Sequence, residues 1–159
     1  MIHQRALSPR EIAALPKGLI DAVPDDVVLV DAHHPLSNLS RIVRGYAVIL
    51  VRGKRIFWPG VPPDMSQDPC DLSVLAHELV HVWQYANGMT LFSYIVRDVI
   101  LRLGRYAYRL KPGKAFSTYG YEQQAAMMED WMRLHAGLAV RHGAGAVDMA
   151  ALQAIVPFL

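Results

Sequence analysis

One strongly marked helix limits the folds that this chain can adopt. Asp68 followed by Pro69 places a capping carboxylate directly before a proline, a pair that commonly opens a helix. Asn87 and Gly88 provide the matching stop signal. The sequence therefore predicts a helix over residues 68–87, and apolar side chains along it require that most of its surface be buried.

The middle of this helix carries the pattern His-Glu-x-x-His. Residues four apart lie on one face of an α-helix, so the imidazoles of His77 and His81 can reach one zinc ion at ~2.0–2.1 Å. Glu78 projects to the side where a zinc-bound water would lie, which suits a general base. The pattern predicts a zinc site whose fourth position stays open for chemistry.

A catalytic zinc needs a third protein ligand, and two candidates can be removed. The extended metzincin pattern would require glycine and histidine where this chain has Gln84 and Asn87. Glu11 stands three residues after Ser8, so it is expected to complete a capping box at the start of a short helix that ends near Leu15. Neither a metzincin histidine nor Glu11 is therefore expected at the metal.

Two glutamates remain, and both lie on a helix that is predicted to begin around Tyr119. Glu122 and Glu129 share one face but are separated by about 10.5 Å along the axis, so one zinc ion is not expected to take both. Ala125 and Ala126 allow a close approach to the helix of the histidines. The sequence favours Glu122 in the first turn and leaves Glu129, an aspartate or a histidine as alternatives.

The order of the patterns predicts an α+β fold in one domain over residues 1–159. β-branched and apolar runs at 26–31, 45–51 and 55–58 indicate strands, and Gly53 supplies the turn of a hairpin. The strands fall in a β-rich part at residues 1–67, and the long helices in a helical part at residues 68–159.

Residues 91–110 are predicted to form a further helix. On a helical wheel Asp98 lies close to three arginines, and most of the remaining surface is apolar. The arginines are Arg102, Arg105 and Arg109. We expect a solvated charged stripe on an otherwise buried helix, with a membrane-surface or partner-binding helix as the alternative.

Composition excludes several classes of protein. Sixteen Lys and Arg against fourteen Asp and Glu give a formal charge of +2, too even to indicate a nucleic-acid partner. The single cysteine, Cys70, excludes an internal disulfide and is expected to be a small core residue.

The N-terminus lacks the apolar stretch of a signal peptide, and no transmembrane segment is predicted. A cytoplasmic location is expected, and the oligomeric state is not predicted.

Two segments together resemble a known family. LAHELVHVWQ at residues 75–84, followed by YEQQA at residues 121–125, is similar to the gluzincin branch of the zincin metallopeptidases, and more narrowly to small bacterial minigluzincin-like proteins. The resemblance is specific over residues 68–87 and 119–126. It implies a zincin-like domain with a small N-terminal antiparallel sheet whose edge strand lines a cleft, an active-site helix and a glutamate helix.

The resemblance also implies a role for each site residue. His77, His81 and Glu122 would bind Zn²⁺, and Glu78 would be the general base of a zinc metalloendopeptidase. Its substrate would be a peptide or protein, hydrolysed by a zinc-activated water.

The chain departs from the family pattern at Ala126, where many gluzincins carry an aspartate that orients a ligand histidine. The orienting group is therefore open, and a backbone carbonyl or Glu129 are the candidates. Tyr119 and Tyr121, and more weakly His135, are candidates for stabilising an oxyanion, on proximity in sequence alone.

Three hypotheses about function follow. The first is the zinc-dependent peptidase. The second is a zinc-binding, zincin-like module with little proteolytic activity, which acts through protein partners or in a secretion-associated role. The chain is short for a peptidase and has no room for a separate substrate domain, which keeps this alternative open. The third is a membrane-surface or partner-binding protein built around residues 91–110.

Overall fold

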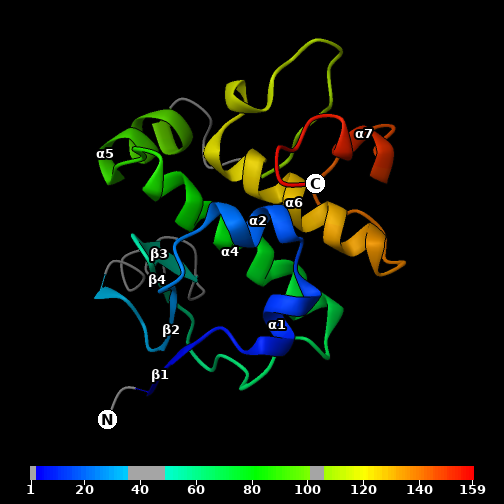
Figure 1. Ribbon diagram of the computed structural model, residues 1–159. Coiled ribbons are helices and arrows are strands. Elements are labelled where there is room, and N and C mark those ends of the chain that lie inside the picture. Colours follow the sequence, from blue (N-terminus) through cyan, green and yellow to red (C-terminus); the bar gives the residue numbers. More distant parts are fainter. Residues whose placement is uncertain (1–2, 36–48, 101–105) are drawn as a thin grey trace.

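The computed structural model describes residues 3–35, 49–100 and 106–159, which form an α+β fold (Figure 1). Within these residues four strands make one small sheet in the order β1-β2-β4-β3. Strand β3 is therefore one edge of the sheet and β1 is the other. The strands are β1 (His3–Ala6), β2 (Val28–Asp31), β3 (Leu50–Arg52) and β4 (Arg55–Phe57).

The sheet is mixed, which corrects the antiparallel sheet expected from the sequence. β1 pairs antiparallel with β2 and β3 pairs antiparallel with β4, but β2 and β4 are parallel. A long connection separates β2 from β3, so the β3–β4 hairpin can join the sheet through β4 in the parallel sense. The hairpin itself is confirmed, with Gly53 in its turn at a φ of 59°. The strand expected at 45–51 is described from residue 49 onward.

Helices begin and end close to the local signals in the sequence. The Ser8 hydroxyl accepts a hydrogen bond from the Glu11 backbone and the Glu11 carboxylate accepts one from Ser8, which confirms the capping box. The Asp68 side chain accepts hydrogen bonds from two backbone N–H groups at the start of α4. The α-helices are α1 (Pro9–Ala14), α2 (Lys17–Ala22), α4 (Pro69–Ala86), α5 (Leu91–Tyr94), α6 (Tyr121–His135) and α7 (Met149–Gln153). A π-helical turn η1 (Ile95–Ile100) follows α5, and a 3-10 turn η2 (Phe116–Thr118) precedes α6.

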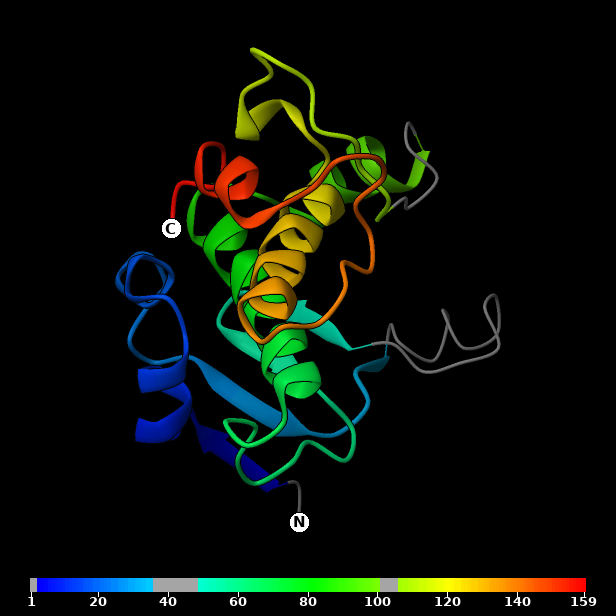
Figure 2. The same cartoon turned by 90° about the vertical axis from the view of Figure 1, so that its right-hand side faces the viewer.

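Helix α4 lies between the sheet and α6 (Figure 2). Ala76 of α4 and both Ala125 and Ala126 of α6 are fully buried, and such small side chains let the two helices approach closely. Leu79 and Met127 are also fully buried and belong to the same core. This packing turns the histidine-bearing face of α4 toward α6. The α+β class is confirmed, while the zincin-like architecture stays a prediction.

The long helix predicted over 91–110 is wrong. Regular α-helix ends at Tyr94, the chain continues as η1, and residues 106–110 have no regular secondary structure apart from one bridge. Asp98 is completely buried rather than part of a solvated stripe. Arg102 and Arg105 lie outside the described residues. Among the described residues, no helix combines the length and apolar character needed to cross a bilayer.

Two smaller expectations concern the outer surface of the helices. Cys70 is exposed at the start of α4, not a core residue, with a guanidinium nitrogen of Arg133 3.9 Å from its sulfur. Cys70 lies in the first turn of α4, before the part of the helix that is buried in the core. His135, near the end of α6, stacks on Trp131, which agrees with a packing role.

Candidate metal centre

The centre begins with two histidines on consecutive turns of α4. His77 and His81 are 5% and 8% exposed, and their ring centroids are 5.0 Å apart. Their spacing of four residues puts both imidazoles on the face that packs against α6. The structure therefore gathers the two predicted histidine ligands at a buried helix interface.

Glu122 completes a three-donor cluster from the first turn of α6. Its Oε2 atom lies 3.3 Å from Nε2 of His77 and 3.3 Å from Nε2 of His81. Two ligands at ~2.0–2.1 Å from a tetrahedral zinc ion lie about 3.3 Å from each other. The three side chains can hold a metal ion between them, and their spacing fits a zinc-sized one.

The second nitrogen of each ring is bound to a different group. Nδ1 of His77 lies 3.0 Å from Oε2 of Glu129, and Nδ1 of His81 lies 2.8 Å from Oε1 of Gln84. An Nδ1–H donated to these oxygens leaves the Nε2 lone pair of each ring free for a metal. Glu129 is thus the orienting group for His77 that the sequence left open. Gln84 plays the same part for His81 and was missed.

Both orienting groups are themselves held in place. The Glu129 carboxylate lies 2.8 Å from Nε2 of His142 and accepts a hydrogen bond from Arg141 at 3.2 Å. The Gln84 amide donates to the Tyr121 carbonyl at 3.0 Å and to the Gln124 side chain at 2.9 Å. The Gln84 contacts run directly from α4 to α6, so the packing of the two helices fixes the ring of His81.

His77, Glu129 and His142 form a second group whose donor atoms could hold a metal. Its contacts of 3.0 Å and 2.8 Å are hydrogen-bond distances, shorter than the separation of two ligands on one zinc ion. The group also uses the ring nitrogen of His77 that points away from His81. We therefore assign the second group to orientation and the first to the metal.

Burial and charge act against each other in this centre. Burial opposes a charge on His77, but hydrogen bonds to Glu122 and Glu129 more than offset it and raise the pKa of His77 to about 10. Burial would raise the pKa of Glu122, yet the two histidines hold it well below its ordinary value. Without a metal, the cluster is therefore a carboxylate closely paired with a protonated imidazole.

A cavity of about 230 Å³ opens beside the cluster. Its walls include the three metal-binding candidates, Glu78, part of β3, and Tyr94 and Tyr106. Glu78 is 8% exposed, and burial raises the pKa of its carboxyl group. Its carboxylate makes no hydrogen bond to another described residue, so it is available to a molecule in the cavity.

The segment α5–η1 fixes the turn that carries Glu122, a function that the sequence did not reveal. Gly120 has no side chain with which to cap α6, and the buried Asp98 carboxylate accepts hydrogen bonds from the N–H groups of Tyr121 (3.0 Å) and Glu122 (3.2 Å). The Tyr94 hydroxyl donates to Oε1 of Glu122. In the sequence, the signal for this was Gly120 at the start of the helix. Because glycine has no side chain to cap a helix, another segment must supply the hydrogen-bond acceptor.

The two predicted oxyanion candidates lie away from the cavity. Tyr119 is buried, and its hydroxyl bonds to the backbone of Arg109 and Lys111. The ring of Tyr121 lies under the guanidinium of Arg97, 4.4 Å from its central carbon. Neither side chain lines the cavity, whereas Tyr94 of α5 and Tyr106 do.

These features define an α+β domain with a buried cluster of two histidines and one glutamate beside a cavity. The effector domain of Pseudomonas aeruginosa VgrG2b is similar in structure, with a TM-score of 0.69 and 25% sequence identity over 94% of this chain and 80% of that one. The type VI secretion system spike protein VgrG2b of P. aeruginosa is 38% identical over 58 residues, 35% of this chain. That stretch is only 6% of the spike protein's length. No family model matches the chain.

The comparisons correct the resemblance to gluzincin peptidases and minigluzincin-like proteins, which was wrong. The structure that matches nearly the whole chain is the effector domain of a secretion spike protein, and neither comparison points to a gluzincin peptidase. The resemblance rested on two short segments, and a few residues spaced for a metal specify local chemistry rather than ancestry.

Proposed function

We propose that this chain is a zinc-binding effector domain that acts in connection with a type VI secretion system. The secretion role is supported by the similarity to the VgrG2b effector domain over 94% of the chain. Zinc binding is supported by one observation above others: both histidines direct Nε2 at the same Glu122 oxygen while their Nδ1 atoms are tied elsewhere. Two imidazoles with one carboxylate suit zinc better than magnesium or calcium.

Metal analysis tests the zinc site directly. Mass spectrometry of protein purified without chelator should find about one zinc per chain, and far less in His77→Ala and in Glu122→Ala. His135→Ala is the matched control, since this histidine stacks on Trp131 outside the cluster and its removal should leave the zinc content unchanged. Protein that neither contains zinc nor takes it up would refute the proposal.

A secretion assay tests the other half of the proposal. The tagged chain, produced in a bacterium with its cognate type VI system, should reach the medium when the system is functional and remain inside when it is disabled. A cytosolic marker protein controls for lysis. Retention in both strains would contradict a secretion role. The cytoplasmic location expected from the sequence stays a prediction that the same assay addresses.

Hydrolysis is the second candidate function, and the uncommitted carboxylate of Glu78 in the cavity wall favours it. Bound zinc would supply Lewis-acid chemistry at the cluster. Glu78, whose pKa is raised by burial, can accept a proton from a water molecule in the cavity and pass it to a departing amine. The test is Glu78→Gln, in which peptide hydrolysis should disappear while zinc content is retained. If wild-type protein binds zinc but does not cleave any member of a peptide library, hydrolysis is contradicted and zinc binding remains as the proposed role.

A further inference from the structure

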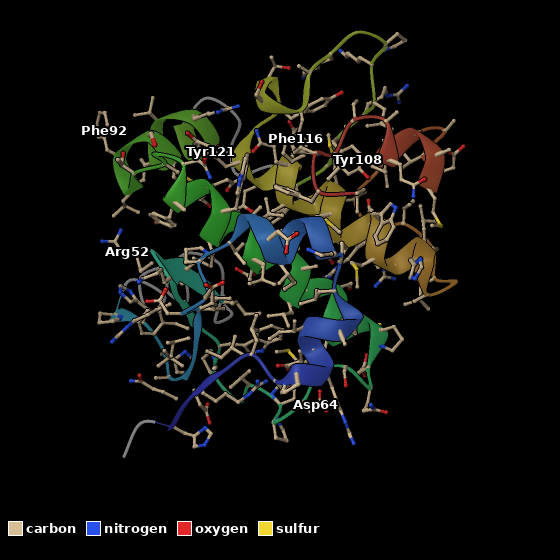
Figure 3. All side chains as sticks on the ribbon, in the orientation of Figure 1. Arg52, Asp64, Phe92, Tyr108, Phe116 and Tyr121 are labelled. Atoms are coloured by element: carbon tan, nitrogen blue, oxygen red, sulfur yellow. The ribbon has the colours of Figure 1, made fainter. Side chains whose placement is uncertain are left out.

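One cationic side chain stands at the rim of the cavity. Arg52 is the last residue of the edge strand β3, is exposed, and is the single lysine or arginine among the described residues that line the cavity. Figure 3 shows it at the end of the sheet nearest α5, while Phe92 lies on the outer side of α5. A ligand entering between β3 and α5 would pass this guanidinium.

The chain itself provides no counter-ion for Arg52. All fourteen Asp and Glu residues lie within the described part of the chain, and none of them forms an ion pair with Arg52. Arg55 faces it across the β3–β4 pair, and like charges directly opposite each other are unfavourable. The neighbouring Lys54 is already paired with Asp26. The positive charge at the rim therefore remains available to an external anion.

The inner end of the cavity does not cancel this charge once a metal is bound. The two carboxylates there, Glu78 and Glu122, balance the charge of a divalent ion. Arg52 then sets the net sign of the cavity. Met89 and Leu91 add apolar surface to the same walls.

We propose that the cavity binds a peptide through a carboxylate that pairs with Arg52, with an apolar neighbouring side chain against Met89 and Leu91. An arginine can hold a carboxylate through two parallel N–H···O bonds, which gives direction as well as attraction. The inference rests on the proposed zinc-binding function and adds the class of ligand. The carboxylate can belong to an Asp or Glu side chain or to a peptide C-terminus, and the experiment separates these sources.

Fluorescence anisotropy with labelled synthetic peptides tests the inference on the zinc-loaded full chain. Three leucine-rich peptides differ in one group: a central Glu with an amidated C-terminus, a central Gln with an amidated C-terminus, and a central Gln with a free C-terminus. Arg52→Gln is the test variant and Arg55→Gln is the matched control, since Arg55 carries the same charge on the adjacent strand but does not line the cavity. Mass spectrometry confirms that each peptide remains intact during the measurement.

One of the two carboxylate peptides should bind wild-type protein about tenfold more tightly than the neutral peptide. Arg52→Gln should abolish this preference, and Arg55→Gln should retain it. Equal binding of all three peptides, or no binding, would overturn the inference, as would a preference that both variants reduce equally. Zinc content measured on the same samples separates the failures: zinc without discrimination rejects only the Arg52 site, while absence of zinc rejects the proposed function.

Discussion

Glu122 and Glu129 stand on one face of α6, yet they meet the same histidine from opposite sides. Glu122 lies 3.3 Å from Nε2 of His77 and Glu129 lies 3.0 Å from Nδ1. Glu122 also reaches His81, whereas Glu129 is surrounded by Arg141 and His142. Two identical side chains on one helix thus take different parts because of the ring nitrogen that each one meets. The first is assigned to the metal because it meets Nε2 of both histidines, and the second is assigned to orienting His77.

The difference between Glu122 and Glu129 also matters in the centre without metal. Each glutamate favours a proton on His77, and together they raise its pKa to about 10 despite burial. A metal at Nε2 must displace the proton held on the Glu122 side, while the proton on the Glu129 side stays. The proton that Glu122 favours on Nε2 therefore competes with the metal, whereas the proton that Glu129 holds on Nδ1 remains when the metal is bound.

Loss of Glu122 should have the largest effect. Glu122→Gln keeps the size of the side chain but removes the anionic donor, so we expect zinc affinity to fall by more than about 100-fold, beyond the range typical of orienting groups. Competition with a chromophoric chelator measures the affinity. Far-ultraviolet circular dichroism should show that α4 and α6 remain folded. A tenfold or smaller loss would indicate that Glu122 is not a ligand.

Loss of Glu129 should have a smaller effect. Glu129→Gln retains an oxygen that can accept from Nδ1 of His77 but removes the charge, and orienting partners of this kind are worth about 10–100-fold in metal affinity. The chelator competition used for Glu122→Gln gives a direct comparison. If Glu129→Gln loses more affinity than Glu122→Gln, the roles of the two glutamates are reversed and the second cluster is the metal site.

Zinc affinity should increase with pH because the metal replaces a proton. The pKa of His77 in the metal-free protein is raised to about 10, so its ring is protonated at neutral pH. The proton released from His77 corresponds to about tenfold tighter binding per pH unit between pH 6 and 8, and this contribution should vanish only as pH approaches 10. Despite burial, Glu122 also raises the pKa of His81, so a proton released from His81 would steepen the slope. Titrations at several pH values in non-coordinating buffers measure the slope. A flat profile over this range would show that His77 is already neutral without metal.

Local sequence signals were sufficient for the helices that carry the site. Asp68 fixed the start of α4, the four-residue spacing placed both histidines on one face, and the first-turn position favoured Glu122. Those features depend on residues close in sequence, where backbone geometry is regular. For the group that orients His77, the sequence left two options, a backbone carbonyl and Glu129. A sequence pattern cannot tell which ring nitrogen a carboxylate will contact.

The other wall of the site could not be predicted in the same way. The helical wheel assumed a regular period of 3.6 residues through 91–110, and the π-helical turn after Tyr94 breaks that period. Asp98 consequently points at the start of α6 rather than at solvent. Gln84 was considered only as a departure from another metal pattern, although it holds the ring of His81. The Asp98 contacts join distant segments and leave no local pattern, whereas Gln84 and His81 are three residues apart in one helix and their contact was missed.

Among the variants that distinguish Glu122 from Glu129, substitution of Tyr94 should have the smallest effect. Its hydroxyl donates to Oε1 of Glu122, the oxygen that does not face the histidines, and so favours binding of the metal through Oε2 alone. Tyr94→Phe removes this hydroxyl and should weaken zinc binding by about two- to tenfold, the worth of one hydrogen bond to a charged group that solvent in the cavity can partly replace. Tyr106→Phe, in the same cavity wall, is the comparison variant.

A cobalt-substituted sample adds a measurement that a purely structural role would not change. The visible absorption of Co²⁺ responds to ligand geometry, so Tyr94→Phe should shift the spectrum if Glu122 gains freedom to bind through both oxygens. Glu129→Gln acts through the ring of His77, and should lower affinity without that change. An unaltered spectrum together with unaltered affinity in Tyr94→Phe would show that the packing of α6 alone, through the Asp98 cap, sets the position of Glu122.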